Sequence, residues 1–438
     1  MPAATRDRAV PTTTEPFGFE RLPVTGLAAT MIAFLAAPAL GFFATLMQIG
    51  CLAAILALRW RSLPRLILGG LPLLALPLFA AASMLWSDIP EVSLRYGVQL
   101  VLTAVAGIAL GRMLTLRQLV MAVFIGLTVA CLAGLALGRT GASEDGPVLI
   151  ALAGSKNQMG YIALAWLGTG LCVASSAGYR IAARLAGGIA AVPALFLIVQ
   201  GDSATALVSA AVLSGLLCLL ALAAWLGRGG RLFALCAAAL LAVPAIVALP
   251  EIERQVAIIQ TDVLKKDARL TGRTLLWEEA DSLIAQAPVI GHGYKAIWLG
   301  PKGKGLLARN GQKDGRAFHF HDTFRELLVD LGMIGLALFL LPLAYAALRA
   351  VVLLIAAVDA PRAFAVVTLF TILLRIRTEL VVGPFMIDTV LLWALVTAIA
   401  ALPLAEPAAA VAAPCHAPVP RRRRRPRRSF PNPQRNPA

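Results

Sequence analysis

The chain has 438 residues, of which 59% are hydrophobic and only 14% are charged, with a formal net charge of +16. A soluble protein of this length could not cover so much apolar surface with polar groups. Apolar stretches of roughly 18–25 residues recur along the chain, and each could cross a bilayer core of about 30 Å. Composition therefore excludes a soluble enzyme and predicts an all-α polytopic integral membrane protein.

The apolar stretches predict about 12 transmembrane helices. Their ranges are 24–39, 40–58, 65–85, 93–111, 118–138, 157–177, 181–199, 204–226, 232–249, 324–348, 362–382 and 385–404. The first two share one stretch that is broken near Pro38 and Gly41, and one long tilted helix is the alternative there. The predicted organisation is an N-terminal tail (1–23), helices one to nine (24–249), a large loop (250–320), helices ten to twelve (321–404) and an Arg-rich tail (405–438).

Positive charge indicates the orientation. Arginines follow the second, fourth, sixth and eighth predicted spans, whereas the turns at 86–92 and 201–203 hold acids and no base. Because short Lys/Arg-rich loops stay cytoplasmic, we expect a multi-pass protein with both termini on the cytoplasmic side and the large loop on the opposite side of the membrane. The run at 421–428 lacks interleaved aromatics and is expected to be a disordered anchor on anionic lipid, so no nucleic-acid partner is expected.

Polar residues of the predicted spans gather near the outer face. Charged groups inside a membrane usually mark a functional site, and arginines suit a diphosphate because they offer bidentate, permanently charged donors. Individual charged residues also have simpler interpretations. Lys156 could extend to the interface, Arg95 could be an interfacial cation, and Arg375 could pair with Glu379 four residues later. The gathered residues are Arg95, Lys156, Asn157, Asp202, Arg375, Arg377, Glu379 and Asp388.

The large loop is the longest polar interval. An amphipathic segment at 250–267 and an amphipathic helix at 271–288 are predicted, with Thr271 as its N-cap and Pro288 as its end. Arg273 in the first turn opposes the helix dipole, which favours a ligand-holding role. The segment 300–315 reads as flexible and basic, and Gly291–Gly293 as a tight turn.

His321 is the candidate general base, because it begins a predicted helix at 322–331 and imidazole titrates near neutrality. An interfacial side chain or helix cap is the alternative role, and His319 is the rival base. A metal site from His292, His319, His321 and Asp322 lacks any paired-His spacing. The six cysteines form no CxxC pair, so we expect no metal site, no cofactor and no disulfide framework.

Several motifs resemble the O-antigen ligase/polymerase superfamily, in its exopolysaccharide-polymerase branch. They are SMLWSDIPEVSLR (83–95), GSKNQMG (154–160), GDSATALVSA (201–210), TGRTLLWEEA (271–280), PVIGHGYKAIW (288–298), and His321-Asp322 followed after nine residues by GMIG (332–335). The chain departs from the family pattern at three positions. Asp322 stands where Asn, Ser or Gln is usual, Ser155 where His is frequent, and Ala204 where a base is usual.

The resemblance implies a protein of the bacterial inner membrane whose large loop lies in the periplasm. It also implies metal-independent, inverting glycosyl transfer from an undecaprenyl-diphosphate-linked oligosaccharide to a glycan hydroxyl. By matching position, Arg273 and His321 would be catalytic, with His321 activating the acceptor. Arg95, Lys156, Arg375 and Arg377 would hold the diphosphate, and Asn157, Asp202, Asp322 and Glu379 would support them. The bilayer and the lipid-linked glycan are the expected partners, and a chain-length regulator is a further candidate. A ligase that moves glycan to a lipid A core or a protein is the first alternative. A transporter of lipid-linked sugars is the second, although it should carry charge at the midplane.

Overall fold

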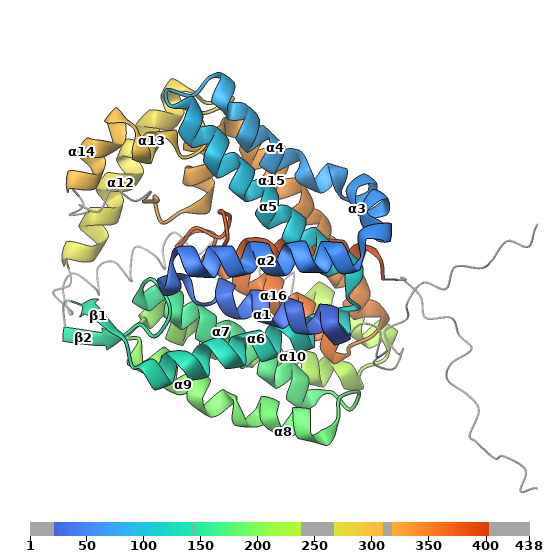
Figure 1. The fold of residues 1–438 in the computed structure, drawn as a ribbon. Helices are drawn as coiled ribbons and strands as arrows, with labels where there is room; N and C mark the ends of the chain where they lie inside the picture. Colours follow the sequence, from blue (N-terminus) through green and yellow to red (C-terminus); the bar gives the residue numbers. More distant parts are fainter. Residues whose placement is uncertain (1–21, 144–145, 238–266, 310–317, 403–438) are drawn as a thin grey trace, which may run out of the picture. The chain divides into compact units, whose positions relative to one another are not determined.

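The computed structural model describes residues 22–143, 146–237, 267–309 and 318–402, and it is mostly helical (Figure 1). The α-helices are α1 (Leu22–Leu35), α2 (Phe42–Leu58), α3 (Leu63–Gly70), α4 (Ala75–Ala82), α5 (Pro90–Met113), α6 (Leu116–Leu137), α7 (Lys156–Ser175), α8 (Ile181–Ile189), α9 (Ala191–Gln200), α10 (Ala204–Trp225), α12 (Asp267–Gln286), α13 (Ala296–Leu299), α14 (Pro301–Arg309), α15 (Thr323–Ala356), α16 (Ala360–Arg375) and α17 (Ile387–Ala400). Two short strands, β1 (Thr140–Ser143) and β2 (Gly146–Leu149), pair antiparallel between α6 and α7. The sequence analysis did not predict this hairpin.

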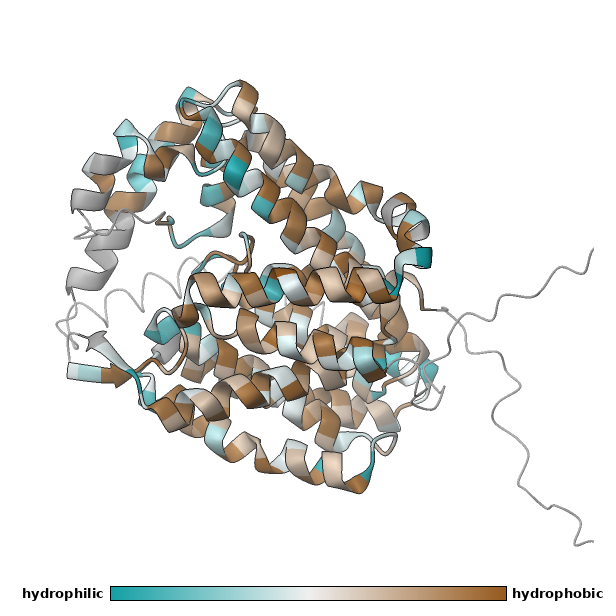
Figure 2. Ribbon diagram, viewed as in Figure 1, coloured by the Kyte–Doolittle hydropathy of each residue, from teal (hydrophilic) through white to brown (hydrophobic). Residues whose placement is uncertain are grey.

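Within the described residues, six helical segments are long and apolar enough to cross a membrane, and α1, α2 and α17 are shorter apolar helices. Hydrophobic residues predominate along these helices, as Figure 2 shows. The chain is therefore a polytopic helical membrane protein. The count of about 12 spans stays a prediction, and most of the expected ninth span (232–249) lies outside the described residues.

The break predicted near Pro38 and Gly41 is confirmed. A short 3-10 turn at Pro38–Leu40 separates α1 from α2, and Gly41 adopts φ 57°. The alternative of one long helix is therefore wrong for this segment. Proline cannot donate to the preceding turn, and glycine permits the left-handed conformation at low cost.

Several predicted helix boundaries are wrong. The span expected at 324–348 continues as α15 to Ala356. The expected span at 362–382 ends as α16 at Arg375, well before Gly383 and Pro384, which would in any case stop a helix. The helix expected at 271–288 begins at Asp267, so Thr271 is inside α12 and is not its N-cap. Its end before Pro288 is as predicted.

Part of the segment predicted as flexible is helical, since α14 covers Pro301–Arg309. Residues 310–315 of that segment and the amphipathic segment up to residue 266 lie outside the described residues. The tight turn at Gly291–Gly293 is confirmed, with φ of 66° and 100° at the two glycines.

Close helix crossings depend on small residues. A Cβ at Gly126 of α6 would lie 2.5 Å from the Ala29 carbonyl oxygen of α1, and one at Gly107 of α5 would lie 2.6 Å from the Val390 carbonyl oxygen of α17. Such contacts let helix backbones approach closely inside a membrane protein, where packing replaces the hydrophobic drive. These crossings fix α1 on α6 and α5 on α17.

The helix α15 is kinked at Gly332, which has φ 64° and ψ −164°. The segment 288–293 lies against this kink: the N–H groups of His292 and Gly293 donate to the carbonyls of Val329 and Asp330, and the Met333 N–H donates to the Pro288 carbonyl. A Cβ at Gly332 would lie 2.3 Å from Val289 backbone atoms, so only glycine fits. These contacts at the kink hold the segment that follows α12 against the first turns of α15, directly after His321.

Candidate functional site

Several of the predicted site residues come together where the ends of five helices meet. Hydrogen bonds and ion pairs join the N-terminal ends of α7, α15 and α17, the start of α10 and the C-terminal end of α16. Residues from positions 156 to 388 thus reach one region of the fold. The gathering of polar groups that the sequence indicated is therefore present, whereas the side of the membrane on which it lies stays a prediction.

His321 sits in a strained turn directly before α15. Its φ is 53°, a left-handed conformation that few residues other than glycine adopt, although histidine adopts it more readily than most. Asp322 is the N-cap and accepts from the N–H groups of Phe324 and Arg325 at 2.9 and 3.2 Å. Thr323 is tied to the chain after α16, because its N–H donates to the Ile376 carbonyl and its hydroxyl donates to the Glu379 carbonyl. The residues that follow His321 are held from both sides, so the backbone that carries the imidazole is fixed.

The nearest charged partner of the His321 ring is Glu379. His321 Nδ1 lies 3.4 Å from Glu379 Oε2, close enough for an ion pair when the imidazole is protonated. The arrangement does not meet the stricter geometry of a hydrogen bond, and Nδ1 is buried. A carboxylate beside one ring nitrogen can orient a base and stabilise its protonated form.

Glu379 is held in turn by a polar chain from two other helices. Asn157 Nδ2 of α7 donates to Glu379 Oε1 at 3.0 Å, and the Ser203 hydroxyl donates to Asn157 Oδ1 at 3.3 Å. Ser203 is also the N-cap of α10. Asn157 and Glu379 were both predicted as supporting residues. They are 222 positions apart in the chain and are joined by one hydrogen bond.

Arg375 is the cation in the adjoining cavity. The cavity has a volume of about 170 Å³, and its lining includes Arg375, Glu379, Asp388, Tyr161 and His319. Arg375 Nη1 donates to Asp388 Oδ1 at 2.7 Å, and its guanidinium lies 3.7 Å from the centre of the Tyr161 ring. The side chain is 6% exposed, so it is a buried guanidinium held by one carboxylate and one aromatic face.

The simple i,i+4 interpretation of Arg375 and Glu379 is wrong in its geometry. Because α16 ends at Arg375, Glu379 lies beyond the helix, and the two residues do not share a helix face. The Glu379 N–H instead closes a turn onto the Arg375 carbonyl at 2.8 Å. This turn directs the carboxylate towards α7 and His321.

Three other predicted cations lie outside the lining of this cavity. Lys156 Nζ is 3.3 Å from Asp202 Oδ2, and Arg377 Nη1 is 3.4 Å from Asp322 Oδ2 with 59% of its side chain exposed. Arg95 is exposed on α5, and its guanidinium lies 4.8 Å from the Tyr96 ring centre. Lys156 and Arg377 are therefore tied to other predicted site residues, whereas Arg95 stacks on its own helix.

Arg273 is in α12, but its side chain lies outside the described residues. The helix itself is anchored beside His321: Trp277 Nε1 donates to the Phe320 carbonyl at 2.9 Å, and Arg325 forms a two-pronged ion pair with Asp281 at 2.9 and 3.2 Å. Positions 273 and 277 are one helical turn apart. The role of Arg273 stays a prediction.

A buried ion cluster supports the turn from the other side. Lys295, 4% exposed, pairs with Glu326 of α15 and lies 3.9 Å from Asp330 Oδ2. Glu326 Oε2 also accepts from the Phe320 N–H at 2.9 Å, one residue before His321. Burial lowers the pKa of Lys295, but the charges of Glu326 and Asp330 more than offset this, so its pKa is raised and the ammonium stays charged.

Potential metal ligands cluster differently from the prediction. Among the described residues, His319, His321 and Glu379 bring ligand atoms within 4.8 Å of one another. His292 is not part of this group, because its Nε2 bonds with the Leu283 carbonyl at 2.9 Å, and Asp322 caps α15. Two imidazoles and a carboxylate would suit zinc. However, Glu379 Oε1 already accepts a hydrogen bond from Asn157, and the backbone N–H of His321 donates to His319 Nδ1.

Sequence reasoning missed two features of the site. Tyr161 shares a face of α7 with Asn157 by its spacing of four, which could have suggested a partner for a buried arginine. The pairing of Lys295 with Glu326 has no local sequence pattern, since the two residues meet only when segment 288–300 packs on α15. A lysine within the apolar GYKAIW run was the available hint.

Two comparisons with known proteins bear on these residues. A protein-family model, O-Antigen ligase, matches residues 189–340, which contain Lys295, His321 and Gly332 but not α7 or α16. The Exopolysaccharide production protein ExoQ of Rhizobium meliloti (strain 1021) is 29% identical over 268 residues, which is 60% of this chain. The match spans 61% of the length of that relative. The resemblance predicted from the motifs is thus confirmed: this bacterial membrane protein is similar to the O-antigen ligase/polymerase superfamily, including a protein of exopolysaccharide production.

Proposed function

We propose that the chain is an inner-membrane polysaccharide polymerase. It transfers glycan from an undecaprenyl-diphosphate-linked donor to the hydroxyl of a glycan acceptor, at the periplasmic face, in exopolysaccharide or O-antigen biosynthesis. The observation that carries the proposal is the His321–Glu379 pair at 3.4 Å beside a cavity lined by the buried Arg375. A base oriented by a carboxylate, next to a fixed cation, suits the displacement of an anionic leaving group by a hydroxyl.

The reaction balances with these groups. The acceptor O–H gives its proton to His321, and the oxygen attacks the anomeric carbon of the donor. The bond between that carbon and the diphosphate oxygen breaks, and the electron pair leaves with the diphosphate. Attack opposite the leaving group inverts the anomeric centre, and no metal is required by these steps.

The cations would hold the leaving group. Arg375 is preorganised by Asp388 and Tyr161, so it pays little entropy on binding an anion. Lys156, Arg377 and Arg273 would add charge around the same headgroup, since charge developing on the diphosphate is stabilised by fixed cations. Arg95 has the weakest support in this set because it stacks on Tyr96 at 4.8 Å.

Loss-of-function variants test the chemistry. We expect His321→Ala and Arg273→Ala each to abolish long-chain polymer in cells while the protein remains in the membrane. Arg180→Ala is the matched control, because Arg180 is exposed before α8 at the opposite end of α7. Normal polymer in both site variants would refute the enzymatic proposal.

The similarity to O-antigen ligases supports one alternative, transfer of a finished glycan to a lipid A core or a protein. The two reactions give different products in a deletion strain. Loss of the polymer itself supports the polymerase, whereas free polymer that is no longer attached supports the ligase. If the protein is instead a transporter of lipid-linked sugars, the purified protein should not lengthen a glycan in vesicles that present donor and acceptor on the same side.

The orientation is testable at Gly305. A Cβ there meets no atom within 4 Å, so Gly305→Cys should fold normally. We expect a membrane-impermeant maleimide to label this cysteine in intact cells with a permeabilised outer membrane, above the signal of the parent protein. Labelling only after the inner membrane is opened would contradict the periplasmic placement.

A further inference from the structure

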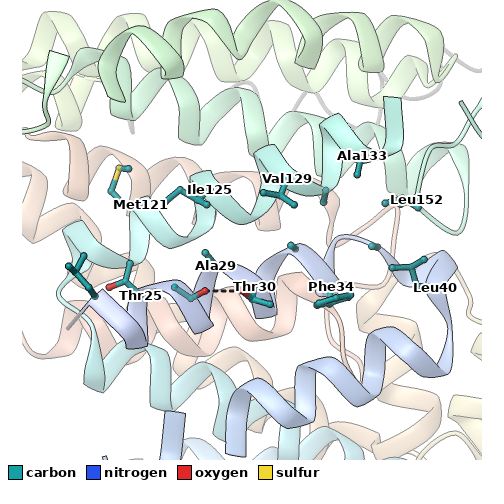
Figure 3. Close-up of a pocket in the computed structure, with 15 residues that line it drawn as sticks. Thr25, Ala29, Thr30, Phe34, Leu40, Met121, Ile125, Val129, Ala133 and Leu152 are labelled. Atoms are coloured by element: carbon teal, nitrogen blue, oxygen red, sulfur yellow. Dashed lines mark hydrogen bonds between the residues drawn. The ribbon is translucent and has the colours of Figure 1, made fainter. Parts of the chain in front are cut away.

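An apolar groove lies between α1 and α6, apart from the cavity that holds Arg375. It has a volume of about 550 Å³, and its lining includes Gly26, Phe34 and Leu40 on one side, Ile125 and Val129 on the other, and Leu152 at one end. Figure 3 shows the side chains of the two helices facing each other across this space. The volume is in the range of small-molecule binding sites.

The lining limits the chemistry of any occupant. Apart from two threonines, every lining residue is glycine, methionine or a residue with a hydrocarbon side chain. The Thr30 hydroxyl is already used, because it donates to the Gly26 carbonyl at 3.0 Å (Figure 3). A polar ligand would lose its hydrogen bonds with water and find few replacements, so the groove suits a hydrocarbon chain.

The course of the groove relates it to the candidate site. From Gly26 to Phe34 it follows α1 for about 12 Å, at 1.5 Å per residue. At the other end it reaches Leu40 and Leu152, whose backbones are joined by the Ala39 N–H donating to the Leu152 carbonyl at 3.0 Å. Ser155, three residues after Leu152, lines the cavity that holds Arg375.

The connection between the two spaces is short. Three residues of fully extended chain span at most about 11 Å, so the Leu152 end of the groove lies within that backbone distance of Ser155. Lys156 follows immediately, paired with Asp202. A hydrocarbon space therefore ends close to a polar, cationic one, which matches a lipid whose anionic headgroup joins a long apolar tail.

We infer that the groove binds the polyprenyl tail of the lipid-linked donor, with the diphosphate at the Leu152 end and the tail running along α1 towards Gly26. The inference rests on the proposed function for the identity of the lipid. It assigns the groove a role in substrate selection: donors whose tail reaches Gly26 bury more apolar surface and bind more tightly than donors with short tails.

Gly26 and Gly50 offer a matched pair of variants. A Cβ at either position meets no atom within 4 Å, but only Gly26 lines the groove. Both are exposed helical glycines, in α1 and α2, so replacement does not lower helix propensity. Gly26→Phe would fill the far end of the groove, whereas Gly50→Phe adds the same ring to a neighbouring helix outside it.

The first measurement is the KM for donors with a full-length polyprenyl tail and with a two-isoprene tail, in proteoliposomes. We expect the wild-type protein and Gly50→Phe to prefer the long-tailed donor. Gly26→Phe should lose about tenfold of that preference, equivalent to the burial of about two methylene groups. An unchanged preference in Gly26→Phe, or an equal loss in Gly50→Phe, would overturn the inference.

The second measurement needs no transfer activity. A benzophenone-bearing polyprenyl diphosphate should crosslink peptides from α1 and α6, and unlabelled polyprenyl phosphate should compete while excess bilayer phospholipid should not. Competition by phospholipid would identify a bilayer acyl chain as the occupant, and crosslinks confined to other helices would exclude the groove. If the groove is crosslinked but the purified protein transfers no glycan, the result would support the lipid-binding site and refute the proposed function.

Discussion

Replacing Glu379 with glutamine removes the charge beside His321 and keeps the shape of the side chain. Glutamine can still accept from Asn157, so the polar chain to Ser203 is preserved. The lost energy is the attraction between Glu379 Oε2 and the protonated His321 ring, whose Nδ1 lies 3.4 Å away. Coulomb's law gives about 5 kcal/mol at an effective dielectric of 20 and about 1 kcal/mol in bulk water. The side chains are 20% and 11% exposed, which places the value between these limits.

If His321 takes the acceptor proton, that energy is lost from the transition state only. Glu379→Gln should therefore lower kcat by roughly 10-fold to a few thousand-fold while leaving the donor KM within about twofold. The assay is polymer extension by protein in proteoliposomes with a lipid-linked repeat unit. Glu278→Gln is the control, because Glu278 is an exposed acid of α12. A kcat equal to that of the control, or a loss confined to KM, would refute the role of this carboxylate.

Three further outcomes are expected. Arg375→Lys should raise the donor KM by about tenfold or more, because an ammonium group lacks the planar, bidentate geometry with which a guanidinium stacks on Tyr161 and binds phosphate. A donor KM equal to that of the wild-type protein would contradict a role of Arg375 in donor binding. Lys295→Met should destabilise the protein by about 3–5 kcal/mol by leaving buried carboxylates unpaired, with partial recovery when Glu326→Gln is added; an unfolding midpoint that does not move would exclude this. Chelation with EDTA should leave transfer unchanged, and activity restored by added zinc would instead show that the His319–His321–Glu379 group holds a metal.

Much of the fold follows from local signals. Hydrophobic runs, the break at Pro38–Gly41 and the stop before Pro288 each appear in the structure close to their predicted positions. The failures are at helix ends. Nothing near Arg375 in the sequence requires a helix to stop there, and the turn to Glu379 is stabilised by contacts from α7 and α15 that no local pattern reveals.

The candidate site was predicted in composition but only partly in its pairings. One-sided charge along the spans correctly indicated that Lys156, Asn157, Asp202, Arg375 and Glu379 gather at one end of the helices. Which acid serves which base depends on tertiary distance, so the pairing of Arg375 with Asp388 could not be read from spacing. For the same reason no local pattern indicated that Glu379, 58 positions after His321, would lie beside its ring.

We propose that the pocket of His321, Glu379 and Arg375 transfers glycan from a polyprenyl diphosphate. The most direct measurement uses purified protein in proteoliposomes with a synthetic lipid-linked repeat unit and product analysis by mass spectrometry. We predict that the wild-type chain forms extended glycan with inverted linkage and releases polyprenyl diphosphate, and that His321→Ala forms neither. Extension by His321→Ala at the wild-type rate, or a product with retained configuration, would contradict the account.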